Sequence, residues 1–281
     1  MSFIKTSCEE PENIRAFLKS KGFSTSLIAK VKLGGCFING DAVHMRASVG
    51  IGDKVEIIFP DEMSEGIPPI DLPLDIIYED DWILAVNKPR NMPIHPSLGN
   101  SLPTVANLVM HYIGAPFVFR AVNRLDRDTS GIVLIAKNQL SGGILSRSIK
   151  QGEVTKHYLA VVDGALEGRG RIDAPIEREE PESMRRIVCP NGKPSITEYE
   201  VLGPAGNGKT LVQVLPITGR THQIRVHFAH IGHPLSCDFL YGKRREGETY
   251  RLHCVSLGFK HPISKEDIIL TAEPPVGFTD L

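Results

Sequence analysis

The chain has 281 residues, of which 41% are hydrophobic and 23% charged, as expected for a soluble protein of about two domains. Its formal net charge of −1 does not by itself point to a nucleic-acid partner. No apolar stretch approaches the ~18 residues of a membrane span, and the first 15 residues lack a signal-peptide core, so we expect a cytoplasmic protein without a membrane partner.

Residues 10–58 are predicted to form one small unit. The stretches ENIRAFLKSKGFS and TSLIAKVKLGG carry apolar residues at helical spacing, with an N-cap available at 24–26 and a glycine stop at 34–35. The following sequence predicts short strands around an Asn-Gly-Asp turn at 39–41. We therefore expect two helices followed by a small sheet.

A linker is predicted at 59–74, where PDEMSEGIPPIDLPL is rich in proline and acid and has no periodicity. From residue 75 to 281, short β-type runs alternate with turn clusters, namely IIY, WILAVNK, GIVLIAK, HYLAVVDG, TLVQVLPI, HQIRVHF and IILTA. Helical patterns are fewer, and LPTVANLVMHYI and LSGGILSRSIKQG are the clearest. The predicted class is α+β, with a mixed, largely antiparallel β-sheet in this second domain.

A dense group of charges lies in AVNRLDRDTSGIVLIAKN, residues 121–138. Arg124, Asp126, Arg127 and Asp128 precede a short apolar run that is predicted to be a buried strand. Charges directed towards the interior must be paired or functional. The stretch is either a capped structural turn or a catalytic loop, and a sharp turn at 129–131 would hold Asp126 at the rim of a cleft.

Local charge and histidine content mark a second region, residues 219–260. It contains seven basic and three acidic residues, a local charge of +4, which suits phosphate binding or a solvated basic face. THQIRVHF is predicted to be a strand with Thr221, Gln223, Arg225 and His227 on one face and His222 on the other. This spacing argues against a metal site, as do five cysteines without a CxxC pair, which indicate a reduced protein.

Together these segments resemble the RluA-type pseudouridine synthases (RluA, RluC and RluD-like). The resemblance rests on YEDDWILAVNKPRNMPIHPS, NRLDRDTSG, KHYLAVV, GRTHQIRVHFAHIGHPLSCDFLYG and RLHCVSLGFKHP, which follow the family's order over nearly all of residues 75–275. LIAKVKLGGCFINGDAV and VGIGDKVEI resemble an S4 RNA-binding domain, a common N-terminal companion in this family.

The resemblance implies an isomerase that converts specific uridines in RNA to pseudouridine without a cofactor or a metal. Asp126 matches the essential carboxylate, which attacks the anomeric carbon or removes the C2′ proton. Arg225 matches the cation beside it. Tyr158, which lies in a strand pattern that usually indicates core packing, matches the tyrosine that stacks on the uracil, and Arg124 matches the arginine that fills the vacated place in the RNA stack.

Further expectations concern RNA contacts and departures from the family pattern. We expect RNA contacts from Arg124, Arg127, Arg220, His222, Gln223 and Arg251, a substrate in ribosomal rather than transfer RNA, and a monomer. Asp128 is expected to be a structural partner of Arg124 or Arg127. Asn123 stands where the family usually has histidine, and Cys237 where it generally has glycine.

Two other functions remain open from the sequence. One is a catalytically inactive RNA-binding or ribosome-assembly factor, which would give no reason for Asp126, Tyr158 and Arg225 to occur together. The other is a metal-dependent hydrolase that uses four histidines, His222, His227, His230 and His233.

Overall fold

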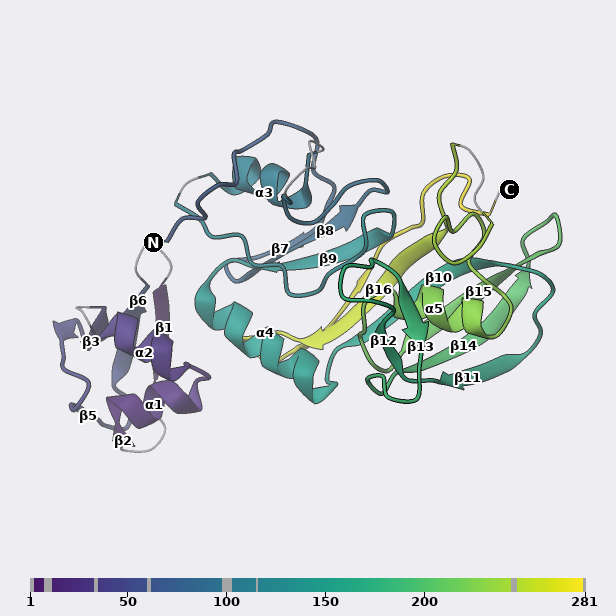
Figure 1. Cartoon of the computed structure of the whole chain (residues 1–281). Coiled ribbons are helices and arrows are strands. Elements are labelled where there is room, and N and C mark those ends of the chain that lie inside the picture. Colours follow the sequence, from purple (N-terminus) through teal and green to yellow (C-terminus); the bar gives the residue numbers. More distant parts are fainter. Residues whose placement is uncertain are drawn as a thin grey trace.

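The computed structural model describes residues 3–7, 12–32, 35–59, 62–97, 103–114, 116–243 and 247–279. Its N-terminal part is a four-stranded sheet in the order β1-β6-β3-β4, with two helices and a separate β2-β5 pair (Figure 1). The elements are β1 (Phe3–Ser7), β2 (Glu12–Asn13), α1 (Ile14–Ser20), α2 (Thr25–Val31), β3 (Cys36–Ile38), β4 (Asp41–Ala42), β5 (Ser48–Val49) and β6 (Lys54–Ile58).

Local sequence signals explain these elements. The side chains of Asn13 and Ser24 accept hydrogen bonds from the backbone at the starts of α1 and α2, as N-caps do. Asn39 and Gly40 have φ angles of 53° and 95°, and two left-handed residues are what a tight hairpin turn requires. The predicted stop at Gly34 lies outside the described residues.

The larger part of the chain is built on a nine-stranded sheet in the order β11-β14-β15-β10-β16-β9-β8-β7, with β17 paired to β16. All its pairings are antiparallel except that of β16 with β9, so the predicted mixed, largely antiparallel sheet is confirmed. The strands are β7 (Ile76–Glu79), β8 (Ile83–Lys88), β9 (Ser130–Ala136), β10 (Thr155–Asp163), β11 (Arg169–Asp173), β14 (Ile196–Pro204), β15 (Lys209–Pro216), β16 (Leu252–Lys260) and β17 (Asp267–Thr271).

Three helices and a small hairpin pack around this sheet (Figure 1). They are α3 (Val105–Ile113), α4 (Gln139–Gln151), α5 (Gln223–His230), and the β12 (Ile176–Arg178) and β13 (Arg186–Val188) pair. Buried side chains of all three helices join one apolar core with the central strands. Both helices predicted in this part from the apolar pattern are present as α3 and α4. Among the described residues, no helix is long and apolar enough to cross a membrane.

The prediction of a strand at THQIRVHF is wrong, because residues 223–230 form helix α5. Arg225 and His227 consequently do not share a face: Arg225 contacts two carboxylates, and His227 contacts Thr197 and the Ala174 carbonyl. The alternation of polar and apolar residues spans only seven positions, too few to separate a strand from a short helix.

The segment predicted as a linker has no helix or strand among its described residues 62–74, but it is attached along its length. Glu62 pairs with both Lys30 and Arg120. Ser64 bonds to the backbone of Phe117 and Phe119, and the Asn107 side chain donates to the Pro68 carbonyl at 2.7 Å. The segment therefore follows a defined path over the larger part.

The N-terminal part packs against the start of α4. Leu140 belongs to the N-terminal apolar cluster, and Trp82, Ile144 and Ile263 pack against it. Lys30 also donates a hydrogen bond to Gln139 at 3.2 Å. The two parts therefore share an apolar contact, which a freely tethered domain would lack.

Candidate active site

The charged group at 124–128 forms a loop that leads into β9. Asp126 has a side chain 30% exposed, whereas Asp128 is 3% exposed and accepts two hydrogen bonds of 3.0 Å from Arg127. Arg124 and Arg127 are exposed. The expectation that all four charges turn inward is therefore wrong: only Asp128 is buried, and its guanidinium partner lies at the surface.

Gly131 fixes how this loop enters the sheet. Its φ is +110°, and a Cβ atom there would lie 2.3 Å from the carbonyl oxygen of Cys254. Strand β9 runs parallel to β16 at this point, with Ser130 opposite His253. The expected sharp turn at 129–131 is instead partly strand, since β9 begins at Ser130, and the glycine allows two backbones to approach closely.

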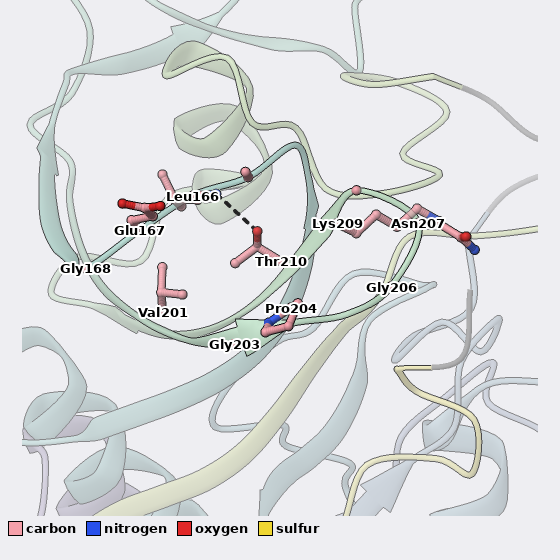
Figure 2. A pocket seen from close by; sticks show the side chains of 12 residues that line it. Leu166, Glu167, Gly168, Val201, Gly203, Pro204, Gly206, Asn207, Lys209 and Thr210 are labelled. Carbon is pink, nitrogen blue, oxygen red and sulfur yellow. Dashed lines mark hydrogen bonds between the residues drawn. The ribbon is translucent and has the colours of Figure 1, made fainter.

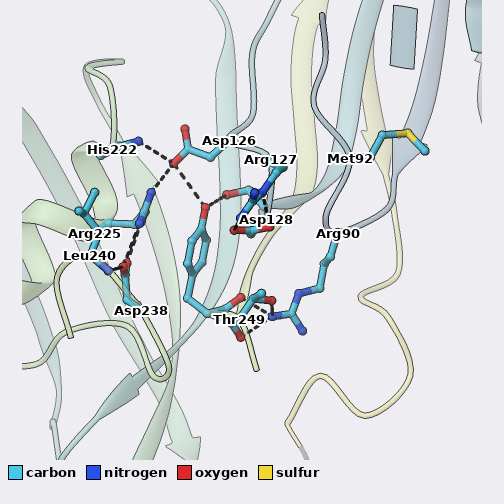
Figure 3. Close-up of polar contacts among 12 residues, drawn as sticks. Arg90, Met92, Asp126, Arg127, Asp128, His222, Arg225, Asp238, Leu240 and Thr249 are labelled. Carbon is cyan, nitrogen blue, oxygen red and sulfur yellow. Dashed lines mark hydrogen bonds and ion pairs between the residues drawn. The ribbon is translucent and has the colours of Figure 1, made fainter. Parts of the chain in front are cut away.

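Arg225 joins two carboxylates in the interior. Its Nη1 donates to Asp126 Oδ2 at 3.2 Å, while Nε and Nη2 donate to the two oxygens of Asp238 at 2.7 and 2.8 Å (Figure 3). Burial alone would lower the pKa of Arg225, but the hydrogen bonds to Asp238 and the charges around it raise it above its usual range. The guanidinium is therefore a permanent cation beside Asp126.

Two further side chains approach the same oxygen of Asp126. The Tyr250 hydroxyl lies 3.5 Å and His222 Nε2 3.8 Å from Oδ2. The ring of Tyr250 also lies under the Arg225 guanidinium at 4.3 Å. Within the described residues, Oδ1 of Asp126 accepts no hydrogen bond, and Figure 3 shows it pointing away from this cluster. One oxygen is thus held by the protein and the other is left for a ligand.

Tyr158 lies on β10, paired with Val214 of β15 and Cys254 of β16. It is 7% exposed. Burial raises the pKa of Tyr158 well above its ordinary value, and the neighbouring Cys254 and the charge of Asp126 add to this effect. The phenol therefore stays protonated at neutral pH.

The residues predicted to contact RNA occupy different environments. Arg124, Arg127 and Arg220 are exposed. The amide of Gln223, by contrast, is 4% exposed and is used by Thr218, Arg220, Ile196 and Thr197. The remaining two have partners within the chain: His222 lies beside Asp126, and Arg251 donates to the carbonyl of Gly277.

Three buried residues at this site were not predicted from the sequence. They are Asp238 and Tyr250, described above, and Lys88 at the end of β8. Lys88 Nζ donates to the carbonyls of Pro89, Met92 and Arg127 at 2.8–2.9 Å. Burial lowers the pKa of Lys88 to about 7, while Asp128 and Asp126 act in the opposite direction. A lysine at the end of an apolar strand was the signal that could have identified it.

The two departures from the family pattern have structural explanations. Asn123 is buried and holds β9, donating to the Ile132 carbonyl at 2.9 Å and accepting from Leu134 N at 2.8 Å. Cys237 adopts the left-handed conformation that a glycine would favour, with φ of 64°, and its thiol contacts Glu248 at 2.9 Å.

Of the four histidines considered for a metal site, three have separate hydrogen-bond partners, and His230 is exposed. His227 contacts Thr197 and Ala174, His222 contacts Tyr241, and His233 Nδ1 lies 2.9 Å from the Asp163 carbonyl. Across the described ranges, no group of three or more histidine, cysteine or acidic residues is arranged to hold a metal ion.

A pocket of about 490 Å³ lies where β10 connects to β11 and where β14 turns into β15 (Figure 2). Leu166, Val201 and Thr210 line it together with several glycines. It shares no lining residue with the Asp126 cluster.

Comparisons with known proteins relate the whole chain to one family. A family model described as RNA pseudouridylate synthase matches residues 82–230. The chain is 37% identical over 276 residues to the Bacillus subtilis (strain 168) "uncharacterized RNA pseudouridine synthase YjbO", covering 95% of this chain and 97% of that protein. It is also 37% identical over 263 residues to "ribosomal large subunit pseudouridine synthase D" of Pasteurella multocida (strain Pm70), covering 87% and 81%. The solved structure of "human RNA pseudouridylate synthase domain containing 1" superposes with a TM-score of 0.62 at 32% identity, covering 74% and 86%.

Proposed function

The chain belongs to the RNA pseudouridylate synthase family, and we propose that it converts uridines of ribosomal RNA to pseudouridine with Asp126 as the essential carboxylate. The observation that carries this proposal is a partly exposed carboxylate: Arg225 holds one oxygen, and the other accepts no hydrogen bond from the part of the chain that the structure describes. The ribosomal substrate is supported by the name of the Pasteurella multocida relative.

The reaction breaks the bond from C1′ to N1 of the uracil, turns the base and rejoins it through C5. An ionised Asp126 serves either route, attack on C1′ or removal of the C2′ proton. Arg225 favours the ionised form, because an opposite charge in contact stabilises a carboxylate. Tyr158 stacks on the uracil, and since its phenol stays protonated, it acts as a packing surface and donor.

Access to the uridine requires that it leave the RNA stack, which costs a few kcal/mol. Arg124 is exposed two positions before Asp126, close enough to fill the vacated place. Arg127 and Arg220 are exposed near the same rim and contact phosphates, while Gln223 and Arg251 support the fold. The N-terminal part, residues 10–58, acts as an S4-like RNA-binding domain. No metal or cofactor is required, and the protein acts as a monomer.

We place this activity in the cytoplasm. The four described cysteines, Cys36, Cys189, Cys237 and Cys254, are free thiols, which suits a reducing compartment. The rival proposal of an inactive RNA-binding factor is disfavoured by the names of the relatives and by the pairing of Arg225 with Asp126.

Replacing Asp126 with Asn tests the proposal. Asn is nearly isosteric and still accepts a hydrogen bond from Arg225, so the melting temperature should change little while pseudouridine formation is lost. Tritium release from ribosomal RNA labelled at uridine C5, measured beside thermal melts, separates these effects. Asp128→Asn is the control: it should lower the melting temperature, because a buried partner of Arg127 is lost, and keep part of the activity. An active, folded Asp126→Asn protein would overturn the proposal.

A further inference from the structure

His222 has an unusual backbone and an unusual use of its side chain. It adopts the left-handed conformation, with φ of 57° and ψ of 17°, at the N-cap of α5, but its side chain makes no capping bond. The side chain is only 15% exposed and lies between two partners instead. Nδ1 lies 2.8 Å from the Tyr241 hydroxyl. Nε2 lies 3.8 Å from Oδ2 of Asp126, the contact drawn in Figure 3. A strained residue held in this way indicates a functional constraint.

The hydrogen bonds determine which ring nitrogen carries the proton. The Tyr241 oxygen accepts the backbone N–H of Arg186 at 2.8 Å, so its own proton is available for His222 Nδ1. Nε2 faces a carboxylate oxygen, which can only accept. Both contacts are favourable when Tyr241 donates to Nδ1 and the ring proton is on Nε2. The other neutral tautomer would set a bare nitrogen against the carboxylate.

The charges around the ring favour its neutral form. Burial lowers the pKa of His222, and the cations Arg225 and Arg186 lower it further, against the opposing effect of Asp126 and Asp238. Burial also raises the pKa of Tyr241 to about 12, so its hydroxyl keeps the proton that it donates. At neutral pH Arg186 N–H therefore donates to the Tyr241 oxygen and Tyr241 O–H donates to His222 Nδ1, while the Nε2–H dipole lies 3.8 Å from Asp126 Oδ2.

We propose that His222 is a positioning residue, fixed in one tautomer by Tyr241, whose Nε2–H dipole attracts Oδ2 of Asp126 across 3.8 Å so that Oδ1 faces the ribose. This assignment rests on the proposed role of Asp126. It gives His222 a role within the site in place of the RNA contact expected from the sequence. Arg225 supplies charge from within α5, and His222, the N-cap residue of the same helix, supplies the dipole of a neutral N–H group. Together with Tyr250, they restrict the rotation of the carboxyl group without occupying its second oxygen.

The tautomer can be measured directly on the full chain. Long-range ¹H–¹⁵N correlation spectra of protein labelled in its histidine rings should show His222 Nδ1 at the position of a bare nitrogen and Nε2 at that of a protonated one, assigned by loss of the signals in His222→Asn. Tyr241→Phe should mix the two forms, and Tyr112→Phe, a change at an exposed tyrosine bonded to Glu79, should not. A protonated Nδ1 in the wild-type protein would overturn the proposal.

Activity measurements test the positioning itself. Asn tolerates the left-handed conformation but is too short to reach Asp126, so His222→Asn should fold normally. Its kcat should fall on the order of ten-fold with KM nearly unchanged. The acidic limb of its pH–rate profile should move to higher pH, because the carboxylate has lost a donor. His230→Gln changes an exposed histidine on the same helix. It should leave kcat, KM and the pH–rate profile unchanged.

Two outcomes contradict the positioning role of His222. If His222→Asn raised KM alone, His222 would instead be a residue that contacts RNA. If the pH–rate profile of His222→Asn were unshifted, the Nε2–H of His222 would not act on Asp126. If Asp126→Asn were active, the proposed function would fail instead, while the tautomer measurement would keep its meaning.

Discussion

A single guanidinium serves two carboxylates at this site, and their surroundings differ. Asp238 is fully buried and uses both oxygens on Arg225, whereas Asp126 is 30% exposed and offers it one. Asp238 therefore fixes the orientation of the guanidinium, and Asp126 receives an already positioned cation. A lysine could not bridge the two in this way, because it lacks the planar fork of donors.

Replacing Arg225 with Met should abolish most activity and move the acidic limb of the remaining pH–rate profile to higher pH. Met preserves much of the volume but removes the cation that favours an ionised Asp126. It also leaves Asp238 buried without its partner, which should cost about 3–5 kcal/mol of unfolding free energy. Tritium-release assays across pH and urea unfolding would measure both effects.

A double variant separates the two consequences. Arg225→Met combined with Asp238→Asn removes the buried negative charge as well, so much of the lost stability should return while activity stays low. An unchanged pH profile in Arg225→Met would argue against the pairing with Asp126. Recovery of activity in the double variant would mean that Arg225 acts only by stabilising the fold.

At the residue scale, prediction relied on motifs and missed contacts between residues that are distant in the sequence. Asp126, Tyr158 and Arg225 were chosen from a family resemblance, and their catalytic roles stay predictions. Tyr250 contacts Asp126 although the two residues are 124 positions apart in the chain, and the local sequence around either residue does not predict that contact. Asp238 lies in a motif that was matched to the family from the sequence. Its pairing with Arg225 could not be predicted, because Arg225 lies on α5, which was predicted to be a strand.

At the scale of elements, local signals determine what the sequence can predict. The start of α2 was recognisable because its cap, Ser24, lies three residues from the backbone N–H that it binds. Helix α5 was missed because its start is set by the loop before it. There the Gln223 side chain accepts from Thr218 and Arg220, and His222 takes a left-handed conformation. These features cannot be read from periodicity.

Gly131 links an element to the catalytic loop, and Gly131→Ala should destabilise the fold by about 3 kcal/mol. The new methyl would meet the Cys254 backbone at a φ of +110°, so β9 and β16 must separate and the Asp126 loop must tilt. Activity should therefore fall more than stability alone explains. Gly143→Ala is the matched control: this helical glycine has nothing within 4 Å of a Cβ, so the change should stabilise α4 by about 0.5–1 kcal/mol. If Gly131→Ala and the wild-type protein unfolded at the same denaturant midpoint, the close approach of the β9 and β16 backbones at Gly131 would be refuted.

At the scale of the whole molecule, composition predicted a segment without helix or strand, which described residues 62–74 match, but it did not indicate what this segment contacts. Glu62 binds Lys30 and Arg120, which lie 32 and 58 positions away along the chain. Proline and acid content reports what a segment cannot form, a helix or a strand, and not what it contacts. The division at 59–74 stays a prediction, and the contacts of this segment decide where the chain can be cut.

A chain that starts at Glu62 should fold and bind RNA less tightly than the full chain. Removing the N-terminal part uncovers Leu140 and Trp82, and because Trp82 is the single tryptophan, its fluorescence emission should shift to longer wavelength. A chain that starts at Leu72 should melt at a lower temperature, since the buried Asn107 amide loses the Pro68 carbonyl at a cost of about 1–3 kcal/mol. Unchanged emission would contradict the apolar contact between the two parts, and unchanged RNA affinity would contradict an RNA-binding role for residues 10–58. An insoluble chain from Glu62 would mean that the larger part needs the N-terminal part to fold.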